Sequence, residues 1–235
     1  MPRRKESYFD TVLVPINKAG WPFIAIFLVA SILLGLLAEE LFWIGLIATA
    51  WCVYFFRDPH RVVPTRPGLI VAPSDGTVCA IEEAAPPAEL ELGDEKLTRV
   101  SIFLNVFDVH VNRVPCYGTV ERVEYHPGKF FNASLDKASV HNERSAVSLL
   151  LPDGRRIVFV QIAGLVARRI INNLRPGQPV VAGERYGLIR FGSRMDVYLP
   201  PGVAPLVIIG QKTVSGETVI ADLESTEPAR LGVRR

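Results

Sequence analysis

A Gly-Ser pair near the end of the chain, Gly192-Ser193, has the residue types needed to break its own peptide bond. The Ser193 hydroxyl can attack the carbonyl carbon of Gly192 and turn the amide into an ester. Elimination would then leave dehydroalanine, and hydrolysis would leave a pyruvoyl group at a new N-terminus. Glycine suits the acyl position because it tolerates the positive φ that such an attack geometry requires. Most Gly-Ser pairs are turns or linkers, so this chemistry needs support from other residues.

A serine that attacks an amide needs a base, and the base needs a group that orients it. His110 lies in the run from 105 to 115, where alternation predicts a strand with Asp108 and His110 on one polar face. Asp75, which directly precedes Gly76, is a second carboxylate, beside Asp108, that could orient the base. A histidine on a strand is commonly structural, and an Asp before Gly is commonly a turn residue, so both remain candidates at this point.

Composition and charge argue against other kinds of site. The net charge is only +2, and no basic block is interleaved with aromatic residues, so nucleic acid is not an expected partner. The cysteines form no Cys-x-x-Cys pair, which predicts neither a disulfide framework nor a metal site and fits a reducing compartment. These cysteines are Cys52, Cys79 and Cys116, and the histidines with loop-like or basic surroundings are His60, His126 and His141.

The N-terminal quarter, residues 1–57, predicts a membrane anchor. Residues 21–38 form an uncharged stretch of 18 residues and residues 41–56 one of 16, with two glutamates between them. As helices they would be roughly 27 and 24 Å long, slightly short of a hydrocarbon core of about 30 Å. Two short spans and an interfacial hairpin both fit these lengths.

Basic residues flank the two apolar stretches on their outer sides, whereas the connecting turn is acidic. The positive-inside rule therefore predicts that both flanks, and the rest of the chain, lie on the cytoplasmic side of the inner membrane. A secretory signal is not expected because a long polar lead precedes the first stretch, a second stretch follows it, and no A-x-A cleavage site comes directly after that first stretch. The basic residues are Arg3, Arg4, Lys5 and Lys18 before the first stretch and Arg57, Arg61 and Arg66 after the second.

The remainder, residues 58–235, predicts one mainly β domain within an α+β chain, because short β-rich runs alternate with Gly and Pro. Two weak internal repeats favour a duplicated β-sandwich or barrel-like hybrid, although chance similarity between Gly-rich turns is an alternative. A helical turn or two is expected at 165–174, and residues 82–95 are expected to form an exposed loop. The repeats are Gly76-Thr77-Val78 with Gly118-Thr119-Val120, and Gly177-Gln178 and Gly183-Glu184 with Gly210-Gln211 and Gly216-Glu217.

The order of four motifs after a membrane-associating N-terminus resembles the short bacterial form of the pyruvoyl-dependent phosphatidylserine decarboxylase family. The resemblance extends from Phe55 to about Leu199. It implies a proenzyme that cuts itself into a β chain, 1–192, and an α chain, 193–235, which stay together as a heterodimer and can form a higher oligomer. The motifs are Asp75-Gly76, Asp108-Val109-His110, Asn142-Glu143-Arg144 and Gly192-Ser193.

The resemblance also implies an activity and roles for single residues. The enzyme would convert phosphatidylserine to phosphatidylethanolamine and CO₂ in phospholipid biosynthesis, with a covalent pyruvoyl group made from Ser193 as its cofactor. Gly192 would be the acyl donor, Asp75 the orienting acid and His110 the base, with Asp108 in a supporting role.

The chain departs from the family's longer members at two positions. Arg113 stands where they have a second histidine, so His110 would serve both self-cleavage and decarboxylation. Arg194 stands where they have Thr after the Gly-Ser pair.

Two loops could contact the lipid. Lys129-Phe130-Phe131 offers an apolar tip with a cation for the membrane surface, and Arg168-Arg169 offers charge for the lipid phosphate. An ordinary loop and a solvated basic turn are the alternatives.

A membrane-anchored lipoyl-like carrier or adaptor without enzymatic activity is the alternative function, because Asp136-Lys137-Ala138 resembles a lipoyl attachment tip. The Gly-rich half-motifs do not bracket Lys137 as a protruding hairpin requires. Pyruvoyl decarboxylases of soluble amino acids are a second rival, against which the apolar hairpin argues.

Overall fold

The computed structural model describes residues 14–128, 142–164, 169–190 and 192–233. The chain divides into two compact units, Met1–His60 and Arg61–Arg235. The first unit is helical and the second is built from β-strands, so the predicted mainly β chain with an N-terminal helical hairpin is confirmed.

The first unit is a hairpin of two helices, α2 (Trp21–Gly35) and α3 (Glu39–Phe55), preceded by a 3₁₀ turn, η1 (Lys18–Gly20). Asn17 caps the turn, since its side-chain oxygen accepts a hydrogen bond from the Ala19 N–H at 3.1 Å. Two glutamates occupy the first turn of α3, where negative charge is favoured by the helix dipole.

Small residues bring α2 and α3 close together. The hydroxyls of Ser31 and Thr49 lie 3.3 Å apart, and a Cβ on Gly45 would lie 2.5 Å from Ser31 Oγ. Most large apolar side chains instead point outward, as Ile44 and Ile47 do at 63% and 70% exposure. The stretch Lys18–Gly35, of 18 residues, is long and apolar enough to cross a membrane. Small residues inside and apolar residues outside are the pattern expected of helices packed in lipid.

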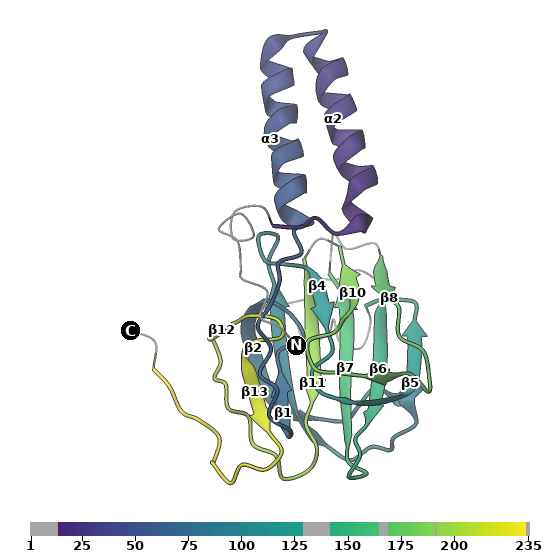
Figure 1. Cartoon of the computed structure of the whole chain (residues 1–235), viewed down its shortest axis with the longest axis vertical. Helices are drawn as coiled ribbons and strands as arrows, with labels where there is room; N and C mark the ends of the chain where they lie inside the picture. The colour runs from purple at the N-terminus through teal and green to yellow at the C-terminus, as the bar shows by residue number, and fades with distance from the viewer. Residues whose placement is uncertain (1–13, 129–141, 165–168, 191, 234–235) are drawn as a thin grey trace, which may run out of the picture. The chain divides into compact units, whose positions relative to one another are not determined.

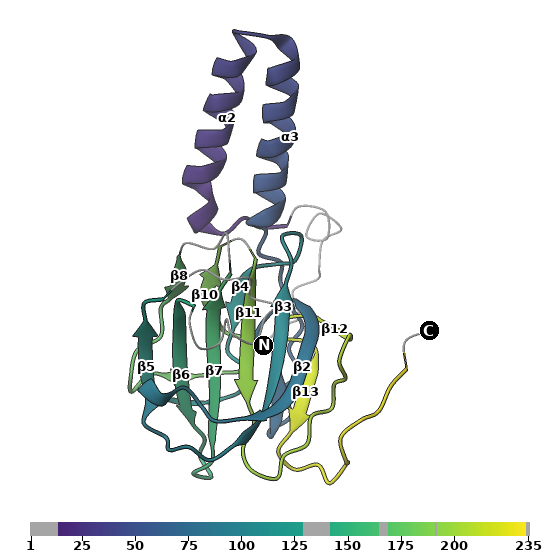
Figure 2. The same ribbon diagram turned by 180° about the vertical axis from the view of Figure 1, so that it is seen from behind.

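The second unit is dominated by one antiparallel sheet of eight strands in the order β12-β2-β3-β11-β7-β6-β5-β9 (Figures 1 and 2). Two smaller antiparallel sheets accompany it, with the orders β4-β10-β8 and β1-β13. The strands of the large sheet are β12 (Lys212–Thr213), β2 (Gly76–Ala84), β3 (Leu97–Leu104), β11 (Ser193–Tyr198), β7 (Arg156–Ala163), β6 (Arg144–Leu150), β5 (Gly118–His126) and β9 (Pro179–Val180). Those of the smaller sheets are β4 (Val111–Arg113), β10 (Arg185–Ile189), β8 (Ile170–Asn172), β1 (Leu69–Val71) and β13 (Val219–Asp222).

The large sheet is internally duplicated, with β2, β3 and β12 on one side matching β5, β6 and β9 on the other. The register of β2 shifts just after Val78, and that of β5 shifts just after Val120, the same position of the repeat. Gly210 N–H donates to Val78 O, and Gly177 N–H donates to Val120 O, both at 2.8 Å. Identical bulges and bonds at the repeated residues confirm the duplication predicted from the sequence.

The second repeat places two glycine turns face to face. Gly183 and Gly216 have φ values of +79° and +78°, which side chains other than glycine's rarely adopt. Gly183 N–H donates to Val114 O, and Gly216 N–H donates to Ala72 O, both at 2.8 Å. A Cβ on Gly216 would lie 3.6 Å from Gly183 Cα, so the two halves of the domain meet at these turns.

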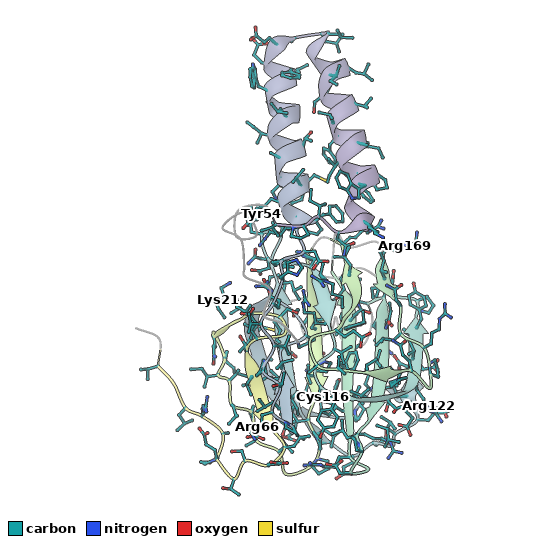
Figure 3. The ribbon with its side chains drawn as sticks, in the orientation of Figure 1. Tyr54, Arg66, Cys116, Arg122, Arg169 and Lys212 are labelled. Atoms are coloured by element: carbon teal, nitrogen blue, oxygen red, sulfur yellow. The ribbon has the colours of Figure 1, made fainter. Side chains whose placement is uncertain are left out.

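The main core lies between the inner face of the large sheet and the smaller sheets. Tyr186 of β10 packs edge-on against Phe159 of β7, with ring centroids 5.3 Å apart. Cys116 belongs to the same core, and burial raises the pKa of its thiol (Figure 3). Arg66, Arg122 and Lys212 mark the periphery of the domain in the same view.

The outer face of the large sheet is also apolar and is covered by the segment at 82–95. Its first residues extend β2, and the 3₁₀ turn η2 (Ala88–Leu90) buries Leu90 against Val158 and Val160 of β7. The prediction of an exposed loop was therefore only partly right: residues 93–95 are exposed and irregular, but Leu90 is buried because a strand with apolar residues on both faces needs a second cover.

The helical turn expected at 165–174 was also wrong where the chain is described. Residues 165–168 lie outside the described residues, and Ile170–Asn172 forms β8, which pairs with β10. Tertiary pairing in a small sheet overrides a weak local helical preference.

Candidate active site

The four candidate motifs meet at one end of the large sheet. Thr77 pairs with Phe103, Phe103 pairs with Arg194, and Ser193 pairs with Leu104. The start of β2 and the start of β11 are therefore two strands apart, or about 10 Å between backbones. The loop that carries Asp108 and His110 leaves the end of β3 between them.

The Asn-Glu-Arg motif reaches the same end from the other side. Ser193 pairs with Ala163, whose N–H donates to Glu143 O at 2.9 Å. The buried Asn142 amide donates to Ala163 O at 2.7 Å. Arg144 instead donates to both carboxylate oxygens of Glu89, at 2.6 and 2.9 Å, on the outer face. The motif thus fixes the strand next to Ser193.

Ser193 lies at the first position of β11 and is fully buried. Met195 and Val197, which share its face of the strand, belong to the main core. Its hydroxyl has no hydrogen-bond partner among the described residues. Gly192 has φ +69°, and a Cβ there would meet nothing within 4 Å, so backbone conformation rather than space favours glycine.

His110 is fully buried and directly precedes β4 of the smaller sheet. Gln161 of β7 donates to the side-chain oxygen of Asn112 at 2.9 Å and so ties the large sheet to β4. His110 is two residues before Asn112, and Ala163, the partner of Ser193, is two residues after Gln161. Both steps lead toward the end of the large sheet where the loop of Asp108 leaves β3, so we expect His110 and Ser193 to lie near the same end.

The orientation of His110 is set by the main chain. Its Nδ1 lies 2.9 Å from Asp108 O, and because a carbonyl only accepts, we assign the ring hydrogen to Nδ1. Nε2 then carries the lone pair that a base requires. The Asp108 carboxylate accepts a hydrogen bond from Asn105 N–H at 2.9 Å. Asp108 therefore supports His110 through its carbonyl and through the shape of the loop.

The strand predicted over 105–115 was wrong for its first half. Only Val111–Arg113 is a strand, β4. Asn105 and Asp108 close a turn, with Asp108 N–H bonded to Asn105 O at 3.0 Å. Short polar side chains that bond the local backbone outcompete the sheet there.

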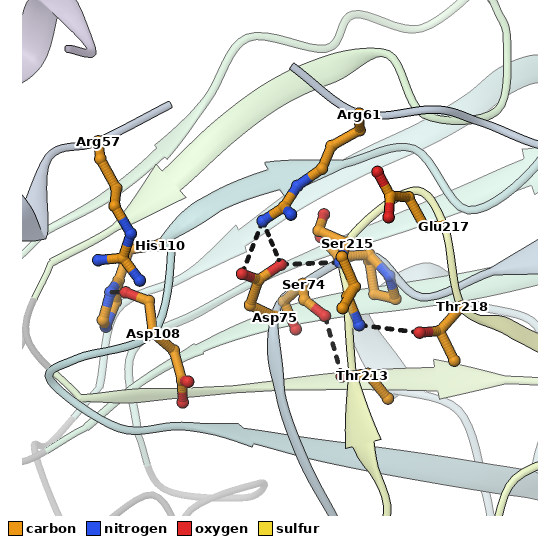
Figure 4. A network of polar contacts seen from close by, with 12 residues as sticks. Arg57, Arg61, Ser74, Asp75, Asp108, His110, Thr213, Ser215, Glu217 and Thr218 are labelled. Carbon is orange, nitrogen blue, oxygen red and sulfur yellow. Dashed lines mark hydrogen bonds and ion pairs between the residues drawn. The ribbon is translucent and has the colours of Figure 1, made fainter. Parts of the chain in front are cut away.

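The carboxylate of Asp75 has three donated hydrogen bonds (Figure 4). Arg61 Nη2 donates to Oδ1 at 2.9 Å and to Oδ2 at 2.7 Å, and Ser215 N–H donates to Oδ1 at 2.8 Å. Burial raises the pKa of Asp75, while Ser215 and Arg61 oppose the rise and the charge of Asp108 adds to it. Asp75, Asp108 and His110 thus belong to one polar region, whereas the role of Asp75 in orienting His110 stays a prediction.

Sequence reasoning missed Arg61 and Ser215 as site residues. Arg61 was read only as a basic flank of the apolar hairpin. A usable signal did exist for Ser215, since it precedes Gly216 of the second repeat as Asp75 precedes Gly76 of the first.

The two positions at which the resemblance implied a departure from longer family members, Arg113 and Arg194, have structural explanations. Arg113 is 5% exposed and donates to Gly183 O at 2.9 Å, which joins β4 to the turn at the junction of the two halves. Arg194 points to the outer face and pairs with Asp196 in two hydrogen bonds of 2.8 Å, both side chains being 1% exposed. Neither arginine needs to act on a substrate to account for its position.

Several predicted residues lie outside the described part of the chain. They are Lys129-Phe130-Phe131, Lys137, His141 and Arg168. Across 14–128, 142–164, 169–190 and 192–233, no three His, Cys, Asp or Glu side chains are grouped so that they could hold a metal ion.

Comparison with known proteins places the whole chain beside one family. Residues 48–221 match the phosphatidylserine decarboxylase family. The chain is 60% identical over 226 residues to the phosphatidylserine decarboxylase proenzyme of Cereibacter sphaeroides, covering 96% of this chain and 97% of that one. It is 57% identical to the proenzyme of Paramagnetospirillum magneticum, with coverage of 93% and 91%, and 55% identical to that of Ruegeria pomeroyi, with coverage of 92% and 98%.

Proposed function

The chain belongs to the phosphatidylserine decarboxylase family, and from this premise we propose that it is a proenzyme that cleaves itself at Gly192-Ser193 and then decarboxylates phosphatidylserine. The product is phosphatidylethanolamine. One observation carries the assignment of the site, namely a fully buried Ser193 hydroxyl without a partner among the described residues, directly after a glycine at φ +69°. Ser74 and Ser101 are also fully buried with unpartnered hydroxyls among the described residues, so the position directly after Gly192 is what distinguishes Ser193.

Self-cleavage uses groups that belong to the chain. Ser193 Oγ attacks the carbonyl carbon of Gly192, His110 Nε2 takes the hydroxyl proton, and the amide nitrogen is protonated as the ester forms. Elimination releases the Gly192 carboxylate, and one water then replaces nitrogen, which leaves as ammonia. Residue 193 thereby becomes a pyruvoyl group at the start of the second chain.

The surroundings of residue 193 fit this group. It would lie on the inner face of β11 beside Met195 and the core, where water is largely excluded, and we expect the buried His110 near the same end of the sheets. When formed, the pyruvoyl group supplies an electron sink for the electrons released as CO₂ departs. His110 holds the proton that the product needs, and Asp75 with Arg61 keeps a fixed charge pair at the edge of the site.

Both chains are expected to remain together after cleavage. The six residues of β11 pair with β3 on one side and with β7 on the other, so the new chain begins inside the large sheet. The two products, 1–192 and 193–235, therefore form a heterodimer that unfolding alone would separate.

The hairpin would hold this site at the membrane where the lipid substrate resides. Lys18–Gly35 meets the length and composition of a membrane span, and the basic flanks support a cytoplasmic position of the second unit at the inner membrane.

Replacement of Ser193 tests the proposal directly. Purified wild-type protein should consist of two chains by intact mass, whereas Ser193→Ala should be a single uncut chain without decarboxylase activity. Ser101→Ala is the matched control, because Ser101 is also fully buried on an adjacent strand with an unpartnered hydroxyl among the described residues. An uncut wild-type chain that is fully active, or a cut Ser193→Ala chain, would refute self-cleavage at this bond. An uncut wild-type chain without activity would favour the carrier or adaptor.

A further inference from the structure

The segment that follows the helical hairpin in the chain is fastened to the β domain at several points. We call residues 61–66 the strap. Val62 N–H donates to Glu217 Oε1 at 2.9 Å, and Arg66 Nη2 donates to Asp222 Oδ2 at 2.5 Å. Arg61 makes the two bonds to Asp75 described above. The strap therefore follows one course along the domain and delivers Arg61 to the candidate site.

Val63 explains why the strap takes this course. A Cβ on Gly183 would lie 2.3 Å from Val63 Cγ2, and a Cβ on Gly216 would lie 3.5 Å from the same atom. Val63 thus fits at the junction of the two duplicated halves because Gly183 has no Cβ there, and it lies at van der Waals distance from the turn of Gly216. Ser215, the third donor to Asp75, belongs to the same turn as Gly216. The strap and this turn together supply the hydrogen-bond donors to the Asp75 carboxylate, Arg61 and Ser215 N–H.

The contact between Arg61 and Asp75 differs from an ordinary surface ion pair. Their side chains are only 14% and 15% exposed, and one nitrogen, Nη2, reaches both carboxylate oxygens. Arg61 Nε is buried without a hydrogen-bond partner among the described residues. An unpaired buried donor is unfavourable, so the position of Arg61 is set by Asp75 rather than by the needs of its own guanidinium group.

Arg61 also acts on the charge of the site. Asp75 faces one cation, Arg61, and one anion, Asp108, and Glu217 lies beside the strap (Figure 4). Burial and Asp108 raise the pKa of Asp75, and Arg61 opposes them. Loss of Arg61 would leave the carboxylate both less fixed in orientation and more readily protonated.

From these contacts we propose that Arg61 is a positioning residue for Asp75, so that the segment following the membrane hairpin completes the active site of the proenzyme. This inference rests on the proposed function, because it assigns Arg61 to the self-cleavage that Asp75 assists. The strap then has a role in the reaction beyond joining two parts of the chain.

The test measures self-cleavage of the full-length proenzyme as a first-order rate at several pH values. Arg61→Met should slow cleavage at least tenfold. It should also move the acidic limb of the rate profile to higher pH, because without Arg61 the Asp75 carboxyl would lose its proton only at a higher pH. Arg61→Lys, which keeps the charge, should keep the limb near its wild-type pH at a lower plateau rate. Arg66→Met is the matched control on the same strap, where the Arg66 side chain is 53% exposed, and it should change neither quantity.

A second comparison separates positioning from folding. In an Asp75→Asn background, Arg61→Met should cause no further loss of rate, because its effect passes through Asp75. Equal rates and equal pH limbs for Arg61→Met and Arg66→Met would overturn the inference and leave the proposed function intact. Should Arg61→Met fail to fold, an Arg61→Lys protein with a wild-type plateau and limb would overturn it equally. Absence of cleavage in the wild-type protein would instead refute the proposed function itself.

Discussion

At the scale of single residues, the candidate site separates its two acids by function. Asp108 shapes the loop and orients His110 through a backbone oxygen, whereas Asp75 keeps its carboxylate in a cradle of three donated hydrogen bonds. A base that is oriented by a carbonyl needs no carboxylate beside it to fix its tautomer. The tautomer of His110 is therefore set within its own loop.

His110→Gln tests whether this histidine is the base. The glutamine amide can still donate to Asp108 O, but it cannot take a proton, so self-cleavage should fall by about 10² to 10⁴-fold. Accumulation of the uncut chain over time measures the effect. Asp108→Asn is the control, because its side-chain oxygen can still accept from Asn105 N–H, and it should cleave within about threefold of wild type. Normal cleavage in His110→Gln would exclude His110 as the base of this step.

At the scale of elements, β11 has to remain in place after its first peptide bond is gone. Arg194 and Asp196 both point to the outer face, and their buried pair ties together the first residues of the strand. Arg99 of β3 adds a weaker contact, with its Nε 3.9 Å from Asp196 Oδ2. The new chain end is therefore fixed from the face opposite to the reaction.

Asp196→Leu should destabilise the protein by about 3 to 5 kcal/mol, because it leaves Arg194 buried without its main counter-charge. The double variant Arg194→Met with Asp196→Leu should recover much of that loss. Thermal unfolding in a Ser193→Ala background measures both, since the chain there stays in one piece. Equal losses in the single and double variants would argue that the ion pair does not hold β11.

The same elements show which features of the fold and of the candidate site could be predicted from the sequence. The repeats at Gly76 and Gly118 predicted the duplication correctly because glycine turns leave a clear local signal. Alternation predicted a strand through Asp108, and it failed because two side chains bonded the local backbone instead. Arg61 was missed because its contact with Asp75, 14 residues further along the chain, leaves no periodic or local signal in the sequence.

At the scale of the whole molecule, one duplicated domain carries a single site. The two halves share turns, bulges and pairing, but Asp75 precedes the first repeat where Tyr117 precedes the second. Asp75 and its donor Ser215 both belong to the first half of the repeats. The duplication thus accounts for the scaffold, whereas the residues proposed for the chemistry differ beside the equivalent turns of the two halves.

Equivalent glycines in the two halves test this separation. A Cβ on Gly76 would lie 2.4 Å from Phe103 O, and one on Gly118 would lie 2.7 Å from Leu150 O. Each change to alanine should destabilise the fold by about 1 to 3 kcal/mol, because a strand would have to shift. Only Gly76→Ala should also slow self-cleavage of the folded protein. A shift of β2 at residue 76 would move Asp75, the preceding residue, relative to Ser193 at the start of β11. Equal cleavage rates at equal stability would mean that the site tolerates movement of its acid, and would weaken the role proposed for Asp75.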